Sequence, residues 1–238
     1  MIKELPWDSI FFKRKIGELK ITSSNKKHIE SLIENAKANG FKYIICKLSL
    51  PQTTHIRLLE SLGFYLSDIG VTLKLETEKF RYQKKGKNSL TESQVRVANE
   101  KDIPKLKKMS KSLFTGSRFY SDPFFTKKEA DSLFQTWVEN SVTGKAADMV
   151  LHIPDKGYIT CRKNKRDKGD IVLIGVRKGF RDKGIGSILM EEAIKWFKTK
   201  DVSSVSVRTQ LKNINALEFY FKLGFHIKNC DLIFAKIL

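Results

Sequence analysis

Residues 176–187, Val-Arg-Lys-Gly-Phe-Arg-Asp-Lys-Gly-Ile-Gly-Ser, combine glycines and basic side chains at close spacing. Residues 170–176 before them are mostly apolar and β-branched, and residues 188–197 after them have apolar positions at helical spacing. The pattern predicts a strand, a glycine-rich turn and a helix. Backbone N–H groups at a helix start lack intrahelical acceptors and lie at the positive end of the helix dipole, so they can bind a phosphate.

The side chains of this turn also favour an anionic ligand. Glycines let the backbone come close to the anion, and an arginine and a lysine add positive charge. We therefore expect a cofactor that carries a pyrophosphate. The residues expected to contact it are Arg181, Lys183, Gly184, Ile185, Gly186 and Ser187.

Two well-known nucleotide-binding loops fit this segment poorly. A P-loop requires Lys-Ser or Lys-Thr directly after its last glycine, whereas Ile-Gly-Ser follows Gly184. A dinucleotide-binding turn requires Gly-x-Gly-x-x-Gly, and Leu189 stands where the third glycine belongs. The segment does resemble Arg/Gln-x-x-Gly-x-Gly/Ala, the coenzyme A pyrophosphate loop of the GNAT superfamily of N-acetyltransferases, with Arg181, Gly184 and Gly186 at its fixed positions. The alternative is a glycine turn that only begins a helix.

Residues 213–225 resemble the second GNAT signature, with Asn213, Tyr220 and a final Leu-Gly-Phe. The resemblance implies that Asn213 contacts the pantetheine arm of acetyl-CoA and that Tyr220 lies beside the thioester sulfur. A phenol there can protonate the thiolate that leaves when an amine attacks. The alternative is that Tyr220 is a core aromatic of an amphipathic helix. The resemblance also implies that the strand around Ile174 and Val176 pairs with the pantetheine amides and that its backbone N–H polarises the acetyl carbonyl.

The two signatures imply an α/β chain with a GNAT acyltransferase domain over residues 95–238, in which helices flank a mixed central sheet in the order βααβββαβαβ. Hydrophobic periodicity and helix start signals fit this order. Helices are expected over residues 102–114, 127–142, 188–197 and 213–223, and a hairpin about residues 155–157.

Residues 1–76 form a further predicted α/β unit, with strands at 16–21, 41–48 and 71–75 and helices at 25–39 and 54–62. Residues 77–94 turn to polar and charged composition and are expected to be a linker.

An internal repeat relates the two units. Residues 42–64 align without gaps on residues 203–225, and both segments end in Leu-Gly-Phe. A glycine after a helix is ordinary C-cap chemistry, but the shared order of strand, turn and helix favours a duplicated half-fold. The first copy has no glycine-rich loop. We therefore predict that residues 1–76 are a partial GNAT-like domain that binds no cofactor.

Over nearly its full length the chain resembles the dTDP-fucosamine acetyltransferase group, which acetylates a dTDP-linked 4-amino-4,6-dideoxy sugar during surface-polysaccharide biosynthesis. The matching pieces are residues 7–12, 62–64, 117–119 and 135–140. The resemblance implies that Arg118 and Phe119 form the lip of the acceptor pocket, where a guanidinium suits a diphosphate and a ring can stack on thymine. It also aligns Asp68 with a glutamate associated with base catalysis through water. The alternatives are an exposed loop cation at residue 118 and a turn residue at residue 68.

Composition limits the partners. The net charge is +19, from 45 basic and 26 acidic residues, but the basic residues form only short runs and no aromatic-basic stripe is present. The three cysteines and four histidines lack metal-site or disulfide spacing. Neither an apolar signal-peptide core at the start nor a run of about 18 apolar residues is found. We expect a cytoplasmic protein without metal, nucleic-acid or membrane partners, and the resemblance adds a homodimer paired through its C-terminal strands.

The leading hypothesis is therefore an acetyl-CoA-dependent N-acetyltransferase that acts on a small nucleotide-sugar amine. A second hypothesis keeps the cofactor site and changes the acceptor to a peptide, polyamine or antibiotic amine. A third is a non-catalytic basic binding module. Intact signatures and Tyr220 weigh against the third.

Overall fold

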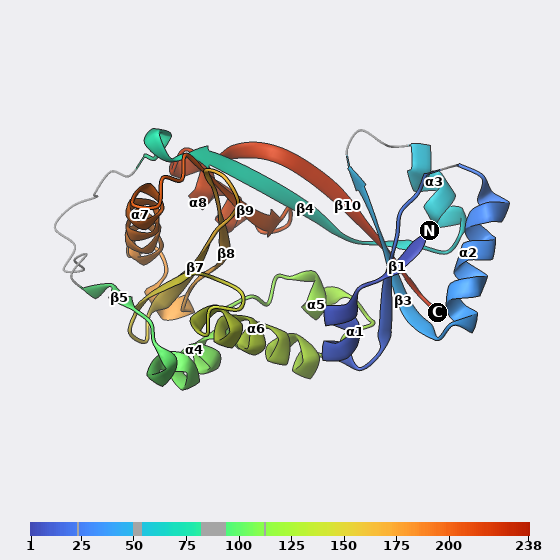
Figure 1. The fold of residues 1–238 in the computed structure, drawn as a ribbon, viewed down its shortest axis with the longest axis horizontal. Coiled ribbons are helices and arrows are strands. Elements are labelled where there is room, and N and C mark those ends of the chain that lie inside the picture. The colour runs from blue at the N-terminus through green and yellow to red at the C-terminus, as the bar shows by residue number, and fades with distance from the viewer. Residues whose placement is uncertain (23, 50–53, 82–93, 112) are drawn as a thin grey trace.

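The computed structural model describes residues 1–22, 24–49, 54–81, 94–111 and 113–238. Its strands form one ten-stranded sheet in the order β1-β2-β3-β10-β4-β9-β8-β7-β6-β5 (Figure 1). The strands are β1 (Ile2–Glu4), β2 (Lys15–Leu19), β3 (Phe41–Ser49), β4 (Tyr65–Glu76), β5 (Arg96–Val97), β6 (Met149–Ile153), β7 (Gly157–Lys163), β8 (Lys168–Val176), β9 (Ser204–Gln210) and β10 (His226–Ile237). The helices are α1 (Pro6–Phe12), α2 (Lys26–Ala38), α3 (Thr54–Ser61), α4 (Ile103–Ser110), α5 (Arg118–Ser121), α6 (Lys127–Val142), α7 (Ile185–Lys198) and α8 (Ile214–Lys222).

Local sequence signals explain most of these elements. The Asn25 side chain caps α2 by accepting from the His28 N–H, and a capping box between Thr126 and Glu129 begins α6. The predicted hairpin is β6 and β7. Three elements were not predicted, namely β1, α1 and α5, because each is too short to show a hydrophobic period. β4 begins six residues earlier than predicted, since Ser67, Asp68 and Gly70 interrupt its apolar alternation.

The internal repeat is longer than the aligned 23-residue segments. β4 and β10 are equivalent over their whole length, since Tyr65 and Glu76 each precede their counterparts His226 and Ile237 by 161 positions (226 − 65 = 161). The residue pairing between β4 and β10 follows the same offset of 161 positions. Tyr65 pairs with Ala235 and Lys74 pairs with His226, and the pairs β3–β10 and β4–β9 correspond in the same way. A pseudo-twofold axis therefore passes between β4 and β10.

The two halves exchange strands across this axis. β4 belongs by sequence to the predicted unit 1–76 and pairs with β9, whereas β10 belongs to the predicted unit 95–238 and pairs with β3. Figure 1 shows the two long strands side by side, with α7 and α8 at one end of the molecule and α2 and α3 at the other. Residues 82–93 of the predicted linker lie outside the described residues. Because both edges of β10 are taken within one chain, we expect the predicted homodimer to use another surface.

Three hydrophobic clusters hold the layers together. One packs α7 and α8 on the sheet of the second half, and another packs α2 and α3 on that of the first. The third lies on the other face and combines α1, α4 and α6 with strands of both halves, including Tyr43, Leu173 and Ala235. This third cluster joins the two halves, and Phe119 and Tyr120 of α5 pack against it.

Candidate active site

Strands β8 and β9 separate at the centre of the sheet. Their parallel pairing runs from Lys168 with Ser204 to Ile171 with Val207, and no further pair is recorded between them although β8 continues to Val176. A bulge accompanies the separation: Val172 has no partner on β7, and the Leu173 N–H donates to Thr160 Oγ1 at 2.9 Å. Bulges bend a strand and increase its twist. The backbone of residues 172–176 thus has one edge without a strand partner, as an extended ligand requires.

The glycine-rich turn begins α7. Gly184 has φ +80° at the N-cap, a conformation that L side chains adopt with strain. The first recorded bond of the helix joins the Ile188 N–H to the Gly184 carbonyl, which leaves the N–H groups of Ile185, Gly186 and Ser187 without intrahelical acceptors. The first turn contains no acidic residue. These features suit a bound pyrophosphate.

Two of the four basic residues of the turn, Arg181 and Lys183, are exposed just before this helix start. Arg181 Nε donates to the Val176 carbonyl at 3.1 Å, and Lys183 Nζ donates to the Gly179 carbonyl at 3.1 Å. Both bonds tie the cations to the segment between β8 and α7. The structure therefore places positive charge in the segment that leads into α7.

Gly186 is the point at which the signature segments meet. A Cβ atom at this position would lie 3.3 Å from the Phe219 ring and 3.8 Å from Val176 Cγ2. The end of β8, the start of α7 and the middle of α8 are therefore in close contact. The structure brings together the glycine-rich turn and the helix that carries Tyr220, although they are separated in the sequence.

Tyr220 is 4% exposed, and its ring centroid lies 5.4 Å from that of Phe225. Its hydroxyl makes no hydrogen bond that is recorded among the described residues. Burial raises the pKa of Tyr220 above the ordinary value of 10.0, so the phenol stays protonated near neutrality. Asn213 is exposed at the start of α8, and its Nδ2 donates to Thr209 Oγ1 at 3.3 Å.

Asp68 lies on β4 at the crossing of the two halves and is 7% exposed. Its Oδ1 accepts from the Ile69 N–H at 2.9 Å. Burial raises the pKa of the Asp68 carboxyl, and the charges of Lys212, Arg118 and Arg208 oppose that rise. A buried carboxyl is thus surrounded by cations from three other elements of the chain.

Arg118 begins α5, and its guanidinium lies 4.4 Å above the Phe119 ring. Its Nη1 atom is buried and has no hydrogen-bond partner among the described residues. Phe119 packs against Phe12 and Phe125 at centroid distances of 5.9 and 5.1 Å. The structure therefore gives the Phe119 ring partners within an aromatic cluster, and its predicted stacking on a base stays a prediction.

Sequence reasoning missed three residues of this region, Asp8, Asp122 and Lys212. Asp8 on α1 is a partly buried carboxyl whose pKa is raised by burial and lowered by Arg118. Lys212 Nζ donates to Ser121 Oγ at 2.9 Å, so it joins the turn before α8 to α5. No motif marks these residues, because they come from elements that only the fold brings together.

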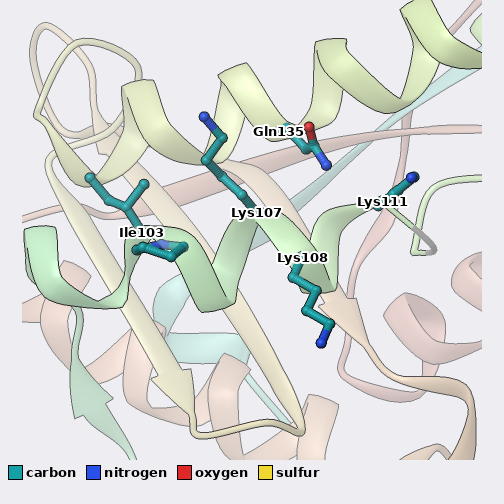
Figure 2. A pocket seen from close by; sticks show the side chains of 6 residues that line it. Ile103, Lys107, Lys108, Lys111 and Gln135 are labelled. Carbon is teal, nitrogen blue, oxygen red and sulfur yellow. The ribbon is translucent and has the colours of Figure 1, made fainter.

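A depression of about 540 Å³ lies elsewhere, between α4 and α6 (Figure 2). Its lining contains none of the predicted site residues: Ile103, Pro104, Lys107, Lys108, Lys111 and Gln135. Lys107 is paired there with Glu139 at 2.5 Å. Among the described residues no group of His, Cys, Asp or Glu could hold a metal ion, and no helix within those ranges is long and apolar enough to span a membrane.

Comparison with known proteins decides the family. The model of the acetyltransferase (GNAT) family matches residues 117–225, which contain β8, the glycine-rich turn and α8. Streptothricin acetyltransferase A of Bacillus subtilis is 35% identical over 120 residues, which are 50% of this chain and 67% of that protein. The chain belongs to the GNAT acetyltransferase family. It is an N-acetyltransferase that uses acetyl-CoA and acts on a small molecule.

Two other relatives of this GNAT chain are named for a nucleotide sugar and for polysaccharide biosynthesis, respectively. The dTDP-fucosamine acetyltransferase of Escherichia coli O6:H1 is 25% identical over 96% of this chain and 94% of that protein. The spore coat polysaccharide biosynthesis protein SpsD of Bacillus subtilis is 29% identical over 52% of this chain and 44% of its own length.

Solved structures confirm the GNAT fold, a mixed sheet flanked by helices. A conserved protein of unknown function from Staphylococcus epidermidis matches 94% of this GNAT chain and 84% of its own, with a TM-score of 0.65 and 14% identity. A tandem GNAT protein from the clavulanic acid biosynthesis pathway matches 93% of this chain and 75% of its own, with a TM-score of 0.61 and 10% identity.

Proposed function

We propose that this GNAT enzyme acetylates the amino group of a nucleotide-linked 4-amino-4,6-dideoxy sugar, of the dTDP type, for surface-polysaccharide biosynthesis. The observation that carries the proposal is Arg118, whose buried Nη1 atom has no hydrogen-bond partner among the described residues while its charge acts on the buried carboxyl of Asp68. A buried guanidinium nitrogen that lacks an acceptor there favours an anionic ligand, and a diphosphate supplies one. Arg118 would bind the diphosphate end of the acceptor, and Asp68 would lie near the amino group at its other end.

The full length of the chain supports this acceptor. The match to dTDP-fucosamine acetyltransferase covers 96% of the chain, so it includes the half that supplies Asp68. Lys212 adds a further cation near that carboxyl, whereas Arg208 is paired with Asp231. Cations such as Arg118 and Lys212 can bind a nucleotide diphosphate and would repel a polyamine.

Acetyl-CoA fits the open edge of β8 and the start of α7. The proposed contacts are those of Ile174 and Val176 with the pantetheine amides, of residues 181 and 183–187 with the pyrophosphate, and of Asn213 with the pantetheine arm. Glycine at position 186 lets the start of α7 pack closely on α8, because a methyl group there would crowd Phe219. When bound, acetyl-CoA supplies the activated acetyl group, and a backbone N–H of β8 would stabilise the carbonyl oxygen during attack.

We assign the proton transfers to two side chains. Tyr220 is buried with a raised pKa, so its phenol holds the proton that it would give to the leaving thiolate. Asp68 has a pKa raised by burial, which makes it a better base for the acceptor ammonium, acting through water. Arg118 would hold the diphosphate, with Phe119 beneath its guanidinium as a platform.

A second candidate acceptor is an antibiotic amine, which the 35% identity to streptothricin acetyltransferase A favours. That match covers 50% of this chain, whereas the match to dTDP-fucosamine acetyltransferase covers 96% of it.

Thiol release from acetyl-CoA tests the proposal. The purified protein is offered dTDP- and UDP-linked 4-amino-4,6-dideoxy sugars in parallel with spermidine, a lysine peptide and streptothricin. We expect release with a nucleotide sugar and a much weaker signal with the other amines. Release with streptothricin, spermidine or the peptide alone would keep the acetyl-CoA site and refute the proposed acceptor.

A further inference from the structure

A buried carboxylate lies directly after the helix that carries Arg118 and Phe119. Asp122 is 3% exposed and accepts four hydrogen bonds, two at each oxygen. Tyr43 OH and Ser67 Oγ donate to Oδ2, the former at 2.6 Å. Tyr65 OH and the Phe124 N–H donate to Oδ1 at 2.9 and 3.1 Å.

The donors show what this network connects. Tyr43 lies on β3 and Tyr65 and Ser67 lie on β4, so three of the four bonds join α5 to strands of the N-terminal half. The Asp122 N–H in turn donates to the Arg118 carbonyl at 2.8 Å. Asp122 is therefore the connection between the N-terminal strands and the backbone of Arg118.

A helix of four residues cannot hold its own geometry, because short isolated helices are unstable in water. The orientation of Arg118 must then come from its surroundings. The aromatic contacts of Phe119 with Phe12 and Phe125 are not directional in the way that four hydrogen bonds to one carboxylate are. A substrate-binding cation that is misplaced by about 1 Å binds its ligand much more weakly.

We propose that Asp122 is a positioning residue for the acceptor site, and that the N-terminal half, which lacks a cofactor loop, acts on catalysis by fixing Arg118 through the Tyr43–Asp122–Tyr65 network. The inference rests on the proposed function, since Arg118 is taken to hold the acceptor. It explains why a half without a glycine-rich loop carries two tyrosines whose hydroxyls converge on a carboxylate of the other half.

Single and double replacement of Tyr43 and Tyr65 by phenylalanine tests the proposal, with acetyl-CoA affinity and the KM and kcat for the nucleotide sugar as readouts. We expect the double variant to raise the acceptor KM about tenfold, which corresponds to about 1.4 kcal/mol, with acetyl-CoA affinity unchanged and kcat altered less than about threefold. Asp122→Asn should likewise raise the acceptor KM, with acetyl-CoA affinity unchanged and kcat altered little. The phenylalanine variants keep the test valid should Asp122→Asn fail to fold.

Tyr120→Phe is the matched control. Tyr120 lies on the same short helix, and its hydroxyl donates to Asp131 of α6 at 2.7 Å, so this change removes a tyrosine–aspartate bond that does not reach the N-terminal half. The control should leave the acceptor KM at the wild-type value. An equal rise of KM in Tyr120→Phe and in the Tyr43 and Tyr65 variants would overturn the proposal, since any loosening of α5 would then suffice. A wild-type KM in the double variant would overturn it as well.

Amide hydrogen exchange of residues 118–125 separates this inference from the proposed function. Faster exchange in the double variant but not in Tyr120→Phe supports positioning, even where the wild-type protein acetylates none of the nucleotide sugars and the proposed acceptor is wrong. Unchanged exchange in the double variant refutes positioning whatever the acceptor is.

Discussion

Gly70 on β4 pairs directly with Asp231 on β10, and the two residues are each other's counterparts in the internal repeat (231 − 70 = 161). The pseudo-twofold axis thus passes through this pair. A Cβ atom at Gly70 would collide with the Arg208 guanidinium, which lies there because it pairs with Asp231 at 2.7 Å. The backbone follows the pseudo-twofold symmetry at this pair, but the residue types of Gly70 and Asp231 do not.

Strand exchange predicts that the two halves stay together after the chain is cut. A protease site inserted between residues 87 and 88 should give a cleaved protein that elutes as one species of the original size, because β4 lies between β9 and β10. Size-exclusion chromatography before and after cleavage measures this. Two separate native fragments would contradict the shared sheet.

Gly186→Glu should lose detectable acetyl-CoA binding while the protein remains folded. The added carboxylate would face the pyrophosphate at the helix start, and its Cβ would also crowd the Phe219 ring. Isothermal titration with acetyl-CoA and circular dichroism provide the two measurements. Gly116→Glu is the control, since a Cβ atom at Gly116 would meet none of the described atoms within 4 Å; it should bind acetyl-CoA normally. Normal binding by Gly186→Glu would refute the loop assignment.

Tyr220→Phe should lower kcat about a hundredfold and leave acetyl-CoA affinity unchanged, because the phenol is assigned to protonate the leaving thiolate. Steady-state kinetics and direct binding measure the two effects. Tyr158→Phe is a matched control, as it removes another buried hydroxyl, which pairs with Ser110 Oγ at 2.8 Å. We expect this control to lower the free energy of unfolding by about 1 kcal/mol and to leave kcat unchanged. Full turnover by Tyr220→Phe would exclude the proton-donor role.

Asp68 should set the acidic limb of the pH–rate profile. Burial raises the pKa of its carboxyl above 3.8, and the base form is the ionised one, so kcat/KM should fall as pH decreases through this raised pKa. The cost of keeping the buried carboxylate ionised is fully present above the folded-state pKa and vanishes below the unfolded-state value. Removing the charge by Asp68→Asn should lower kcat/KM about a hundredfold and remove the limb.

Asp68→Glu is the control for that experiment. It keeps a carboxylate and introduces the glutamate that the dTDP-fucosamine acetyltransferase group has at this position. It should retain the limb and most of the activity. An Asp68→Asn profile with the wild-type limb would assign the base to another group.

The proposed cofactor site was the part of this protein most accessible from its sequence. The role predicted for residues 181–187 depends on backbone conformation and local charge, which the order of residues determines within one turn. Helices α2, α6 and α8 were predicted closely for the same reason, since capping residues and a 3.6-residue period are local signals.

The proposed acceptor region was less accessible. Arg118, Phe119 and Asp68 were singled out only through resemblance, Asp8 only as part of the matching segment 7–12, and Asp122 and Lys212 not at all. Asp122 is 79 residues from Tyr43 and 57 from Tyr65, and no spacing rule relates such positions. The network exists because β3 and β4 pass on either side of β10 and bring their tyrosines beneath α5.

The sequence alone determined the GNAT family, the glycine-rich turn before a helix, the order of most elements and the presence of a repeat, since each depends on residues close together in the chain. Only the tertiary structure decided that the halves exchange β4 and β10, that Val176, Gly186 and Phe219 meet, and that Asp122 links the N-terminal strands to Arg118. Strand order and the convergence of side chains depend on which distant segments bury their apolar faces together. Local sequence patterns do not specify which segments those are.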